Sequence, residues 1–231
     1  MKKAILASVL ALVVCVSSRA MAAMQITEFC SNSGVGNFEF VEFTNTGPVP
    51  VDMSGWSEDD SNRTPNKAGH VLSAFGSVQP GESVIYTEAT PDAFRQYWWG
   101  SVAAAPAGLK IIGPYTNDNL SSSSDEINLF DNASPTPTLI DRLTYPGTGG
   151  GTASSITRNA PIGYLANSNN NAAFIDSAVG DVFGSFHASQ NQALVGNPGS
   201  YLVPEPASLA GIMLAGFAGL IRRSRNGRSP R

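Results

Sequence analysis

Short segments in which apolar and polar side chains alternate recur through the first two thirds of the chain. Residues 24–29 alternate in this way, and residues 38–44 are rich in aromatic and β-branched side chains, as is typical of strands. Further short apolar runs predict strands at 83–87, 109–112, 126–130, 139–145 and 155–158. Turn residues separate these runs. Many short strands divided by turns predict a mainly β domain with a β-sandwich fold.

One segment, residues 91–99, has the pattern of a helix instead. Thr90 precedes Pro91, which is typical of an N-cap followed by proline in the first turn, and Gly100 follows as a stop signal. The apolar face of this helix would consist of Phe94, Tyr97 and Trp98. We expect that face to pack on the core rather than to form an aromatic platform for sugars. Loops are predicted at 57–69, 147–155 and 167–171.

The beginning of the chain has the features of an export signal. Two lysines are followed by a mostly apolar run at 4–16, and Ala20 and Ala22 then form the small-x-small pattern that signal peptidase recognises. The run is shorter than the ~20 residues that span a bilayer. We therefore predict a signal peptide over residues 1–22, cleaved after Ala22.

Residues 203–228 combine three features in a fixed order. The first is a Val-Pro-Glu-Pro motif that cannot be helical through its middle, formed by Val203, Pro204, Glu205 and Pro206. The second is the uncharged, mostly apolar run 207–221, which predicts a single transmembrane helix covering ~22 Å. The third is a basic cluster formed by Arg222, Arg223, Arg225 and Arg228. By the positive-inside rule this cluster stays in the cytoplasm, so the rest of the chain lies outside.

The region between the two signals, residues 23–201, is long enough for one domain and is strongly acidic. It carries 6 Lys and Arg against 17 Asp and Glu, a formal charge of −11, although the whole chain has only −4. Such a charge argues against nucleic-acid binding through phosphate contacts. After signal cleavage Cys30 is the only cysteine, so an intramolecular disulfide is excluded. A buried, hydrophobic role is favoured over a free thiol or an intermolecular bridge.

Catalytic motifs are missing from the sequence. Its two histidines, His70 and His187, lie far from any nucleophile motif or second metal-ligand position. Glu39 and Glu42 could act as a glycosidase carboxylate pair, although strands of any acidic domain supply such pairs. We expect a protein that is not an enzyme, with a secreted hydrolase acting on polysaccharide as one alternative.

A calcium site is a second alternative. Glu58, Asp59 and Asp60 concentrate hard oxygen donors in a polar stretch, which suits Ca²⁺. The stretch does not have the EF-hand spacing or its glycine, so a solvated acidic loop is the favoured interpretation. No other cofactor is indicated.

The order of features in residues 203–228 resembles the PEP-CTERM sorting signal. This resemblance implies recognition and removal of the tail by an exosortase, a membrane-embedded cysteine transpeptidase, with Pro204, Glu205 and Pro206 carrying the recognition. It also implies a Gram-negative host that makes exopolysaccharide. A permanent single-span anchor is the alternative for the tail.

The order of motifs between residues 24 and 200 resembles the lamin-tail domain family. The matching segments are 26–29, 40–47, 51–56, 80–82, 127–130, 140–141 and the closing Asn-Pro-Gly at 197–199. The resemblance implies an immunoglobulin-like β-sandwich without catalytic residues, which serves as a binding or structural module. The helical segment 91–99 and the Asn- and Gly-rich stretch depart from the family pattern.

Together these features predict an exported protein of the cell surface or extracellular matrix. Signal peptidase, an exosortase and the inner membrane would be its processing partners, and exopolysaccharide or other surface proteins its candidate ligands. The tail would hold the protein in the inner membrane before its release to the surface or medium. A hydrolase and a calcium-dependent adhesion module are the alternatives.

Overall fold

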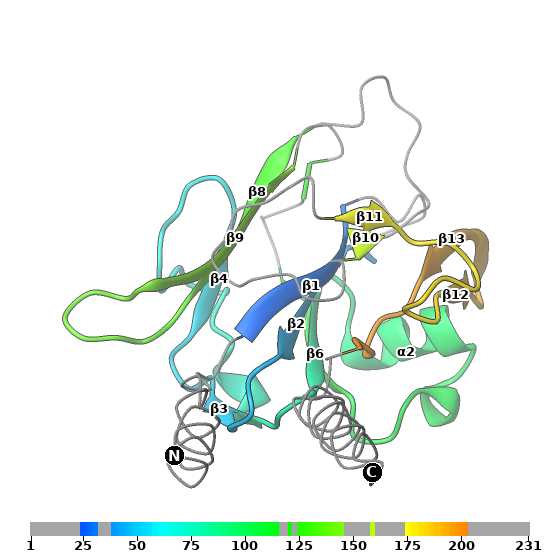
Figure 1. Cartoon of the computed structure of the whole chain (residues 1–231), viewed down its shortest axis with the longest axis horizontal. Helices are drawn as coiled ribbons and strands as arrows, with labels where there is room; N and C mark the ends of the chain where they lie inside the picture. Colours follow the sequence, from blue (N-terminus) through cyan, green and yellow to red (C-terminus); the bar gives the residue numbers. More distant parts are fainter. Residues whose placement is uncertain are drawn as a thin grey trace, which may run out of the picture.

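The computed structural model describes residues 24–31, 38–115, 120–121, 124–145, 158–159 and 174–202, and this part of the chain is mainly β (Figure 1). The predicted signal peptide with Ala20 and Ala22 lies outside the described residues. So do the sorting motif Val203–Pro206, the predicted helix 207–221 and the arginine cluster. Among the residues that the structure describes, no helix is long and apolar enough to cross a membrane.

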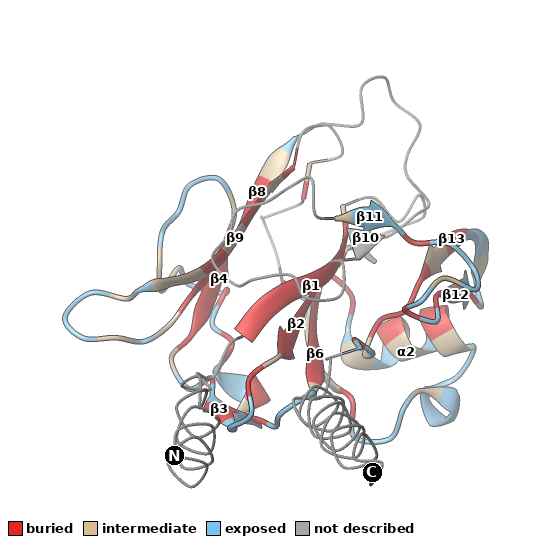
Figure 2. Ribbon diagram, in the orientation of Figure 1, coloured by how far each residue is buried: buried red, intermediate tan, exposed pale blue. Residues whose placement is uncertain are grey.

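The largest sheet has six strands in the order β11-β10-β1-β2-β6-β7. Its strands are β1 (Met24–Cys30), β2 (Phe40–Asn45), β6 (Ser83–Thr87), β7 (Lys110–Ile112), β10 (Arg158–Asn159) and β11 (Ile175–Asp176). All neighbours pair antiparallel except β6 and β7, which are parallel. Every residue of β1, β2 and β6 is buried, because other elements cover both faces of the sheet (Figure 2).

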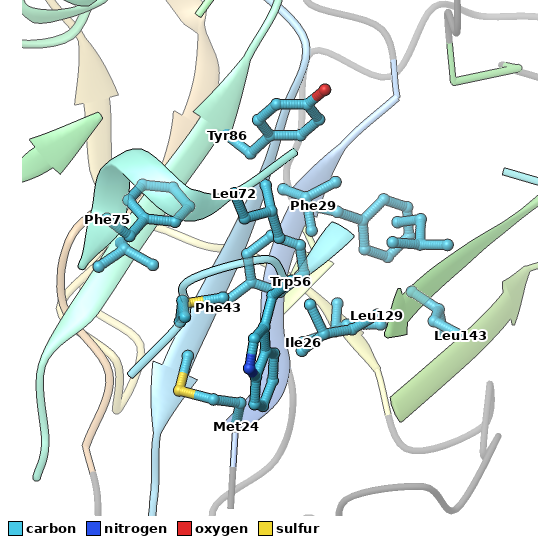
Figure 3. Close-up of a cluster of buried hydrophobic side chains, with 14 of the residues drawn as sticks. Met24, Ile26, Phe29, Phe43, Trp56, Leu72, Phe75, Tyr86, Leu129 and Leu143 are labelled. Carbon is cyan, nitrogen blue, oxygen red and sulfur yellow. The ribbon is translucent and has the colours of Figure 1, made fainter. Parts of the chain in front are cut away.

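A three-stranded antiparallel sheet in the order β4-β8-β9 packs against one face of the large sheet. It consists of β4 (Ser57–Asp59), β8 (Asp125–Phe130) and β9 (Leu139–Tyr145), and a smaller pair joins β3 (Val51–Asp52) to β5 (Ser77–Val78). Side chains of both sheets meet in one core together with the 3-10 turn η1 (Ser73–Phe75) (Figure 3). Fully buried members of this core include Ile26, Phe43, Leu72, Ile127 and Leu129. The predicted sandwich is confirmed.

The opposite face of the large sheet is covered by α2 (Pro91–Trp99) and the hairpin β12 (Phe186–Ala188)–β13 (Asn191–Gly196), and the exposed 3-10 turn η2 (Val102–Ala104) lies next to α2 (Figure 1). The helix begins as predicted, because the Thr90 side chain accepts a hydrogen bond from Ala93 N and Pro91 occupies the first turn. It ends at Gly100 in the left-handed conformation. Its aromatic face packs in a second core, as expected, where Cys30 is also buried.

One predicted loop was wrong in part. Ser57–Asp59, placed in the polar stretch 57–69, forms strand β4 and pairs antiparallel with β8. Three consecutive polar residues give no apolar alternation, so the pattern did not reveal the strand. Their side chains are nevertheless buried, since neighbouring segments supply partners for each of them.

Candidate functional site

A β-bulge in strand β1 places two buried carboxylates opposite each other. Ile26 pairs with Phe43, but the next paired residue is Glu28, which lies opposite Glu42, so Thr27 is the extra residue of the bulge. Ile26 points into the core between the two sheets. Thr27 and Glu28 instead make their contacts with Glu42 and with the end of the domain. In a regular strand the side chains of Thr27 and Glu28 would point to opposite faces of the sheet. Because of the bulge, both point toward Glu42 and the end of the domain.

Backbone amides from the last described segment of the chain bind these carboxylates. The amide of Asn197 donates to Glu28 Oε1 at 2.9 Å, and the amide of Gly199 donates to Glu42 Oε2 at 2.6 Å. Both glutamates are fully buried, and Asn197 is buried with them. We call this arrangement of Glu28, Glu42, Asn197 and Gly199 the carboxylate clasp. It joins the chain 157 residues after Glu42 back to the centre of the large sheet.

A chain of hydroxyl groups supports Glu42 from the side. Thr27 Oγ1 donates to Glu42 Oε1 at 2.7 Å, and it also lies 2.7 Å from Thr44 Oγ1. Thr44 Oγ1 in turn lies 2.7 Å from the Ser83 hydroxyl on β6. Each hydroxyl can donate or accept a hydrogen bond. The donors and acceptors in this row of hydroxyls can therefore exchange roles when Glu42 gains or loses a proton.

The turn that reaches the clasp requires a glycine. Gly199 has φ +85°, and a Cβ there would lie 2.9 Å from Leu109 Cδ1. Asn197 closes the turn by accepting the Ser200 amide at its carbonyl and by donating its side-chain amide to the Ser200 carbonyl. Gly199 and Asn197 therefore determine the shape of the turn, and the turn directs their two backbone amides at Glu42 and Glu28.

Burial raises the pKa of Glu42 from 4.5 to about 7, although hydrogen bonds from Thr27, Gly199, Ser83 and Thr44 act in the opposite direction. The desolvation of a carboxylate in this apolar setting outweighs the four donors. Near neutral pH the carboxyl of Glu42 is therefore present in both its protonated and ionised forms.

A second group of titratable side chains lies on the other face of β2, within the sandwich. Glu39 accepts the Leu120 amide at 2.8 Å, and burial together with the charge of Glu88 raises its pKa to about 8. The nearby Tyr115 hydroxyl is buried, and burial, with the charges of Glu39, Glu58 and Glu88, raises its pKa well above 10. Tyr115 stacks on Tyr86 with ring centroids 4.6 Å apart.

The glycosidase interpretation of Glu39 and Glu42 does not fit this geometry. Successive side chains of a strand point to opposite faces, so two residues three positions apart lie on different faces. Glu39 contacts the segment at Leu120 inside the sandwich, whereas Glu42 contacts Gly199 under the helical layer. The two carboxylates do not face a common substrate.

The three residues of the predicted calcium site are not brought together. Glu58 lies 3.6 Å from His70 Nδ1, and Asp59 lies 3.1 Å from Lys67 Nζ. Asp60 accepts the backbone amide of Asn62 in a local turn. Neighbouring residues of a strand point to opposite faces, which separates Glu58 from Asp59. Across the described segments, no group of three or more acidic, histidine or cysteine side chains could hold a metal ion.

Asp141 on β9 links the two sheets. Its Oδ2 accepts the amide of Ile26 at 2.9 Å, and its Oδ1 accepts the amide of Arg142 at 2.9 Å. Asp141 is fully buried, as is Ile26. One side chain thus satisfies a backbone donor of β1 that lies beside the bulge.

We predict that Asp141→Ala lowers the free energy of unfolding by about 2–3 kcal/mol, because a buried amide loses a charged acceptor. Asp141→Asn keeps one acceptor oxygen and should lose roughly half as much. Urea unfolding followed by tryptophan fluorescence measures both values. An alanine variant as stable as the parent would show that Asp141 does not link the sheets.

The sequence pattern did not reveal the contact of Glu28 and Glu42 with the Asn-Pro-Gly turn, because it indicated Glu28 and the turn only through the family resemblance and Glu42 also as a partner of Glu39. A signal was available, since acidic side chains interrupt the most apolar strands of the chain at residues 28 and 42. The bulge that brings them to one region depends on pairing between strands, which no local pattern reveals.

Comparison with known proteins identifies the family of the domain. A family model described as the Lamin Tail Domain matches residues 17–147, more than half of the chain. The chain belongs to the lamin tail domain family. The match spans β1 to β9 and includes α2, so the expected resemblance is confirmed over this range. No curated protein and no solved structure matches the chain.

The lamin tail domain match ends before the turn that completes the clasp. Glu28 and Glu42 lie inside the matched segment, whereas Asn197 and Gly199 lie 50 residues or more beyond its end. The later segment therefore closes the lamin tail domain from outside the matched range.

Proposed function

We propose that the protein is an exported, non-catalytic component of the cell surface or extracellular matrix. Its lamin tail domain serves as a binding or structural module, and residues 203–228 direct its sorting by an exosortase. The carboxylate clasp carries this proposal. It completes the fold at Gly199, four residues before the sorting motif begins at Val203. Removal of the tail would therefore leave the contacts of the domain intact.

The use of the buried acids supports a structural rather than a catalytic role. Glu28, Glu42 and Asp141 accept backbone amides from distant segments of their own chain. Each joins parts of the fold that are far apart in sequence. Acids used in this way stabilise one arrangement of strands.

The net negative charge of the domain is compatible with an extracellular location. A formal charge of −11 over residues 23–201 favours solubility and disfavours nucleic acid. Exopolysaccharide and other surface proteins are the proposed ligands, and the inner membrane holds the protein until the tail is removed.

Intact mass spectrometry of the protein from membrane, surface and medium fractions of its native host tests the sorting. We expect the parent protein to lose both the signal peptide and the tail. A variant with Pro204, Glu205 and Pro206 all replaced by alanine should keep the tail and stay in the inner membrane, because recognition is lost.

A matched control replaces the Pro-Thr-Pro triplet 135–137, which lies in a loop between β8 and β9, by alanines. This variant should be processed like the parent. A full-length tail in the inner membrane for parent and motif variant alike would identify a permanent anchor and overturn the proposed sorting.

A further inference from the structure

Three exposed aliphatic side chains belong to residues 174–202, the last described segment of the chain. Val179, Val182 and Leu202 are 58%, 64% and 49% exposed, among the highest values for large hydrophobic residues of the described chain. Val182 and Leu202 adjoin Phe183 and Tyr201, whose rings stack at 5.9 Å. The stack therefore brings the exposed loop between β11 and β12 next to the last described residues (Figure 2). We call Val179, Val182 and Leu202 the exit patch.

The loop that carries the exit patch is held rigidly from within. Asp181 Oδ1 accepts the amides of Phe183 and Ser185, and its Oδ2 accepts the amide of Ala178 and the Ser185 hydroxyl. Four donors thus surround the one carboxylate of this loop. The valines on either side of Asp181 are left pointing outward.

The sequence between the exit patch and the predicted transmembrane helix is short. Only the four residues 203–206 separate Leu202 from the apolar run, and two of them are prolines. Four extended residues reach ~13 Å at most. The headgroup region on one side of a bilayer takes up roughly half of that length. The domain surface at Leu202 would then lie within about one side-chain length of the headgroups.

From this short connection and the exposed aliphatic side chains, we infer that the exit patch is a membrane-contact surface. It inserts Val179, Val182 and Leu202 among the headgroups and upper acyl chains of the bilayer while the tail is still attached. This inference rests on the proposed function, because it requires the tail to span the membrane.

The charges around the exit patch give the contact an orientation but do not drive it. Residues 174–202 contain no lysine or arginine, and their acidic residues are Asp176 and Asp181. Attraction to anionic lipids therefore does not drive the membrane contact. The apolar side chains of the exit patch and the short connection to the tail drive it. The strongly acidic remainder of the domain is repelled by anionic headgroups, which leaves this end as the face that approaches.

Full-length chain without its signal peptide, reconstituted into vesicles of phosphatidylethanolamine and phosphatidylglycerol, tests the inference. Val182→Cys carries an environment-sensitive fluorophore, and Val71→Cys, 43% exposed beside β4, is the matched control. Cys30 is buried, and labelling of the parent protein measures its background. Flotation of the vesicles reports whether the chain is membrane-anchored, and lipid-borne quenchers report contact of each labelled site.

We expect both variants to float with the vesicles and quenching at residue 182 to exceed that at residue 71 by about twofold or more. A flexible Gly-Ser linker inserted between Leu202 and Val203 should lower the quenching at residue 182. Flotation with equal quenching at both sites would overturn the inference and leave the proposed function standing. A chain that does not float would overturn the transmembrane tail, and the inference with it.

Discussion

Replacing Glu42 by glutamine should raise the free energy of unfolding at pH 8 by about 3 kcal/mol and leave it nearly unchanged at pH 4.5. Glutamine has the shape of the protonated glutamate but cannot ionise. The variant therefore avoids the cost of burying a carboxylate under the clasp. Its stability should change less with pH than that of the parent.

The direction follows from the raised pKa of Glu42. Its pKa is 4.5 in its ordinary state and about 7 in the folded protein, because burial disfavours the charged form. The folded state then holds its proton more tightly than the unfolded state. The stabilising contribution of the protonated form is complete below pH 4.5 and is lost as the pH rises to about 7. The raised pKa of Glu39 acts in the same direction up to about pH 8, so a large part of the pH dependence remains in the variant.

The hydrogen bonds of the clasp can accommodate glutamine. Its carbonyl oxygen can accept the Gly199 amide, and its NH₂ group then faces the hydroxyls of Thr27 and Thr44. Those hydroxyls can turn to accept, since the chain from Thr27 to Ser83 can reverse direction. No buried donor needs to lose its partner.

Urea unfolding between pH 4.5 and 8 measures the difference. Asp92→Asn is the matched control, because it removes one carboxylate whose side chain is 78% exposed on α2. It should leave the parent's pH dependence in place. A Glu42→Gln variant that loses stability with rising pH as steeply as the parent would exclude Glu42 as the origin.

The central strands of the large sheet were predictable because their apolar, aromatic and β-branched residues are typical of strands, whereas β11 at the edge of the sheet was not predicted. Residues 24–29 and 38–44 correspond closely to β1 and β2, and the start of α2 was visible in Thr90 and Pro91. These features depend on neighbours in sequence. The family match confirms the same region.

The site was not predictable to the same degree, since it depends on pairing between distant segments. Acidic residues in a strand ordinarily indicate a solvent-facing side, yet Glu28 and Glu42 are buried beneath α2 and the hairpin β12–β13. Their position follows from the bulge at Thr27 and from the turn at Gly199, 157 residues after Glu42. Similarly, β4 consists of polar residues that become buried only through partners such as His70 and Lys67.

Gly113→Ala should destabilise the domain by about 3 kcal/mol or more, a large part of the roughly 5–15 kcal/mol that holds a typical domain folded. A Cβ at this position would lie 2.1 Å from the Ala89 carbonyl oxygen and 2.6 Å from the Thr87 carbonyl oxygen. Both neighbours are backbone atoms, so no rotation of a side chain relieves the contact.

The surrounding hydrogen bonds prevent the backbone from moving aside. The Thr87 carbonyl accepts the Tyr115 amide at 3.1 Å, and the Thr87 hydroxyl donates to the Glu39 carbonyl at 2.7 Å. A shift at Gly113 would displace Tyr115 from its stack on Tyr86. Packing and hydrogen bonds would therefore be lost together.

Gly108→Ala is the matched control for this prediction. Gly108 has φ +81°, and no atom lies within 4 Å of its Cβ position, so alanine there adds only backbone strain of about 1 kcal/mol. Urea unfolding should thus rank the Gly113 variant well below the Gly108 variant, and near-ultraviolet circular dichroism should report the loss of the tyrosine stack. The reverse order would show that the connection after β7 can move. The close approach of Gly113 to the Thr87 and Ala89 carbonyls would then not be what fixes Tyr115 beside Glu39, Glu58 and Glu88.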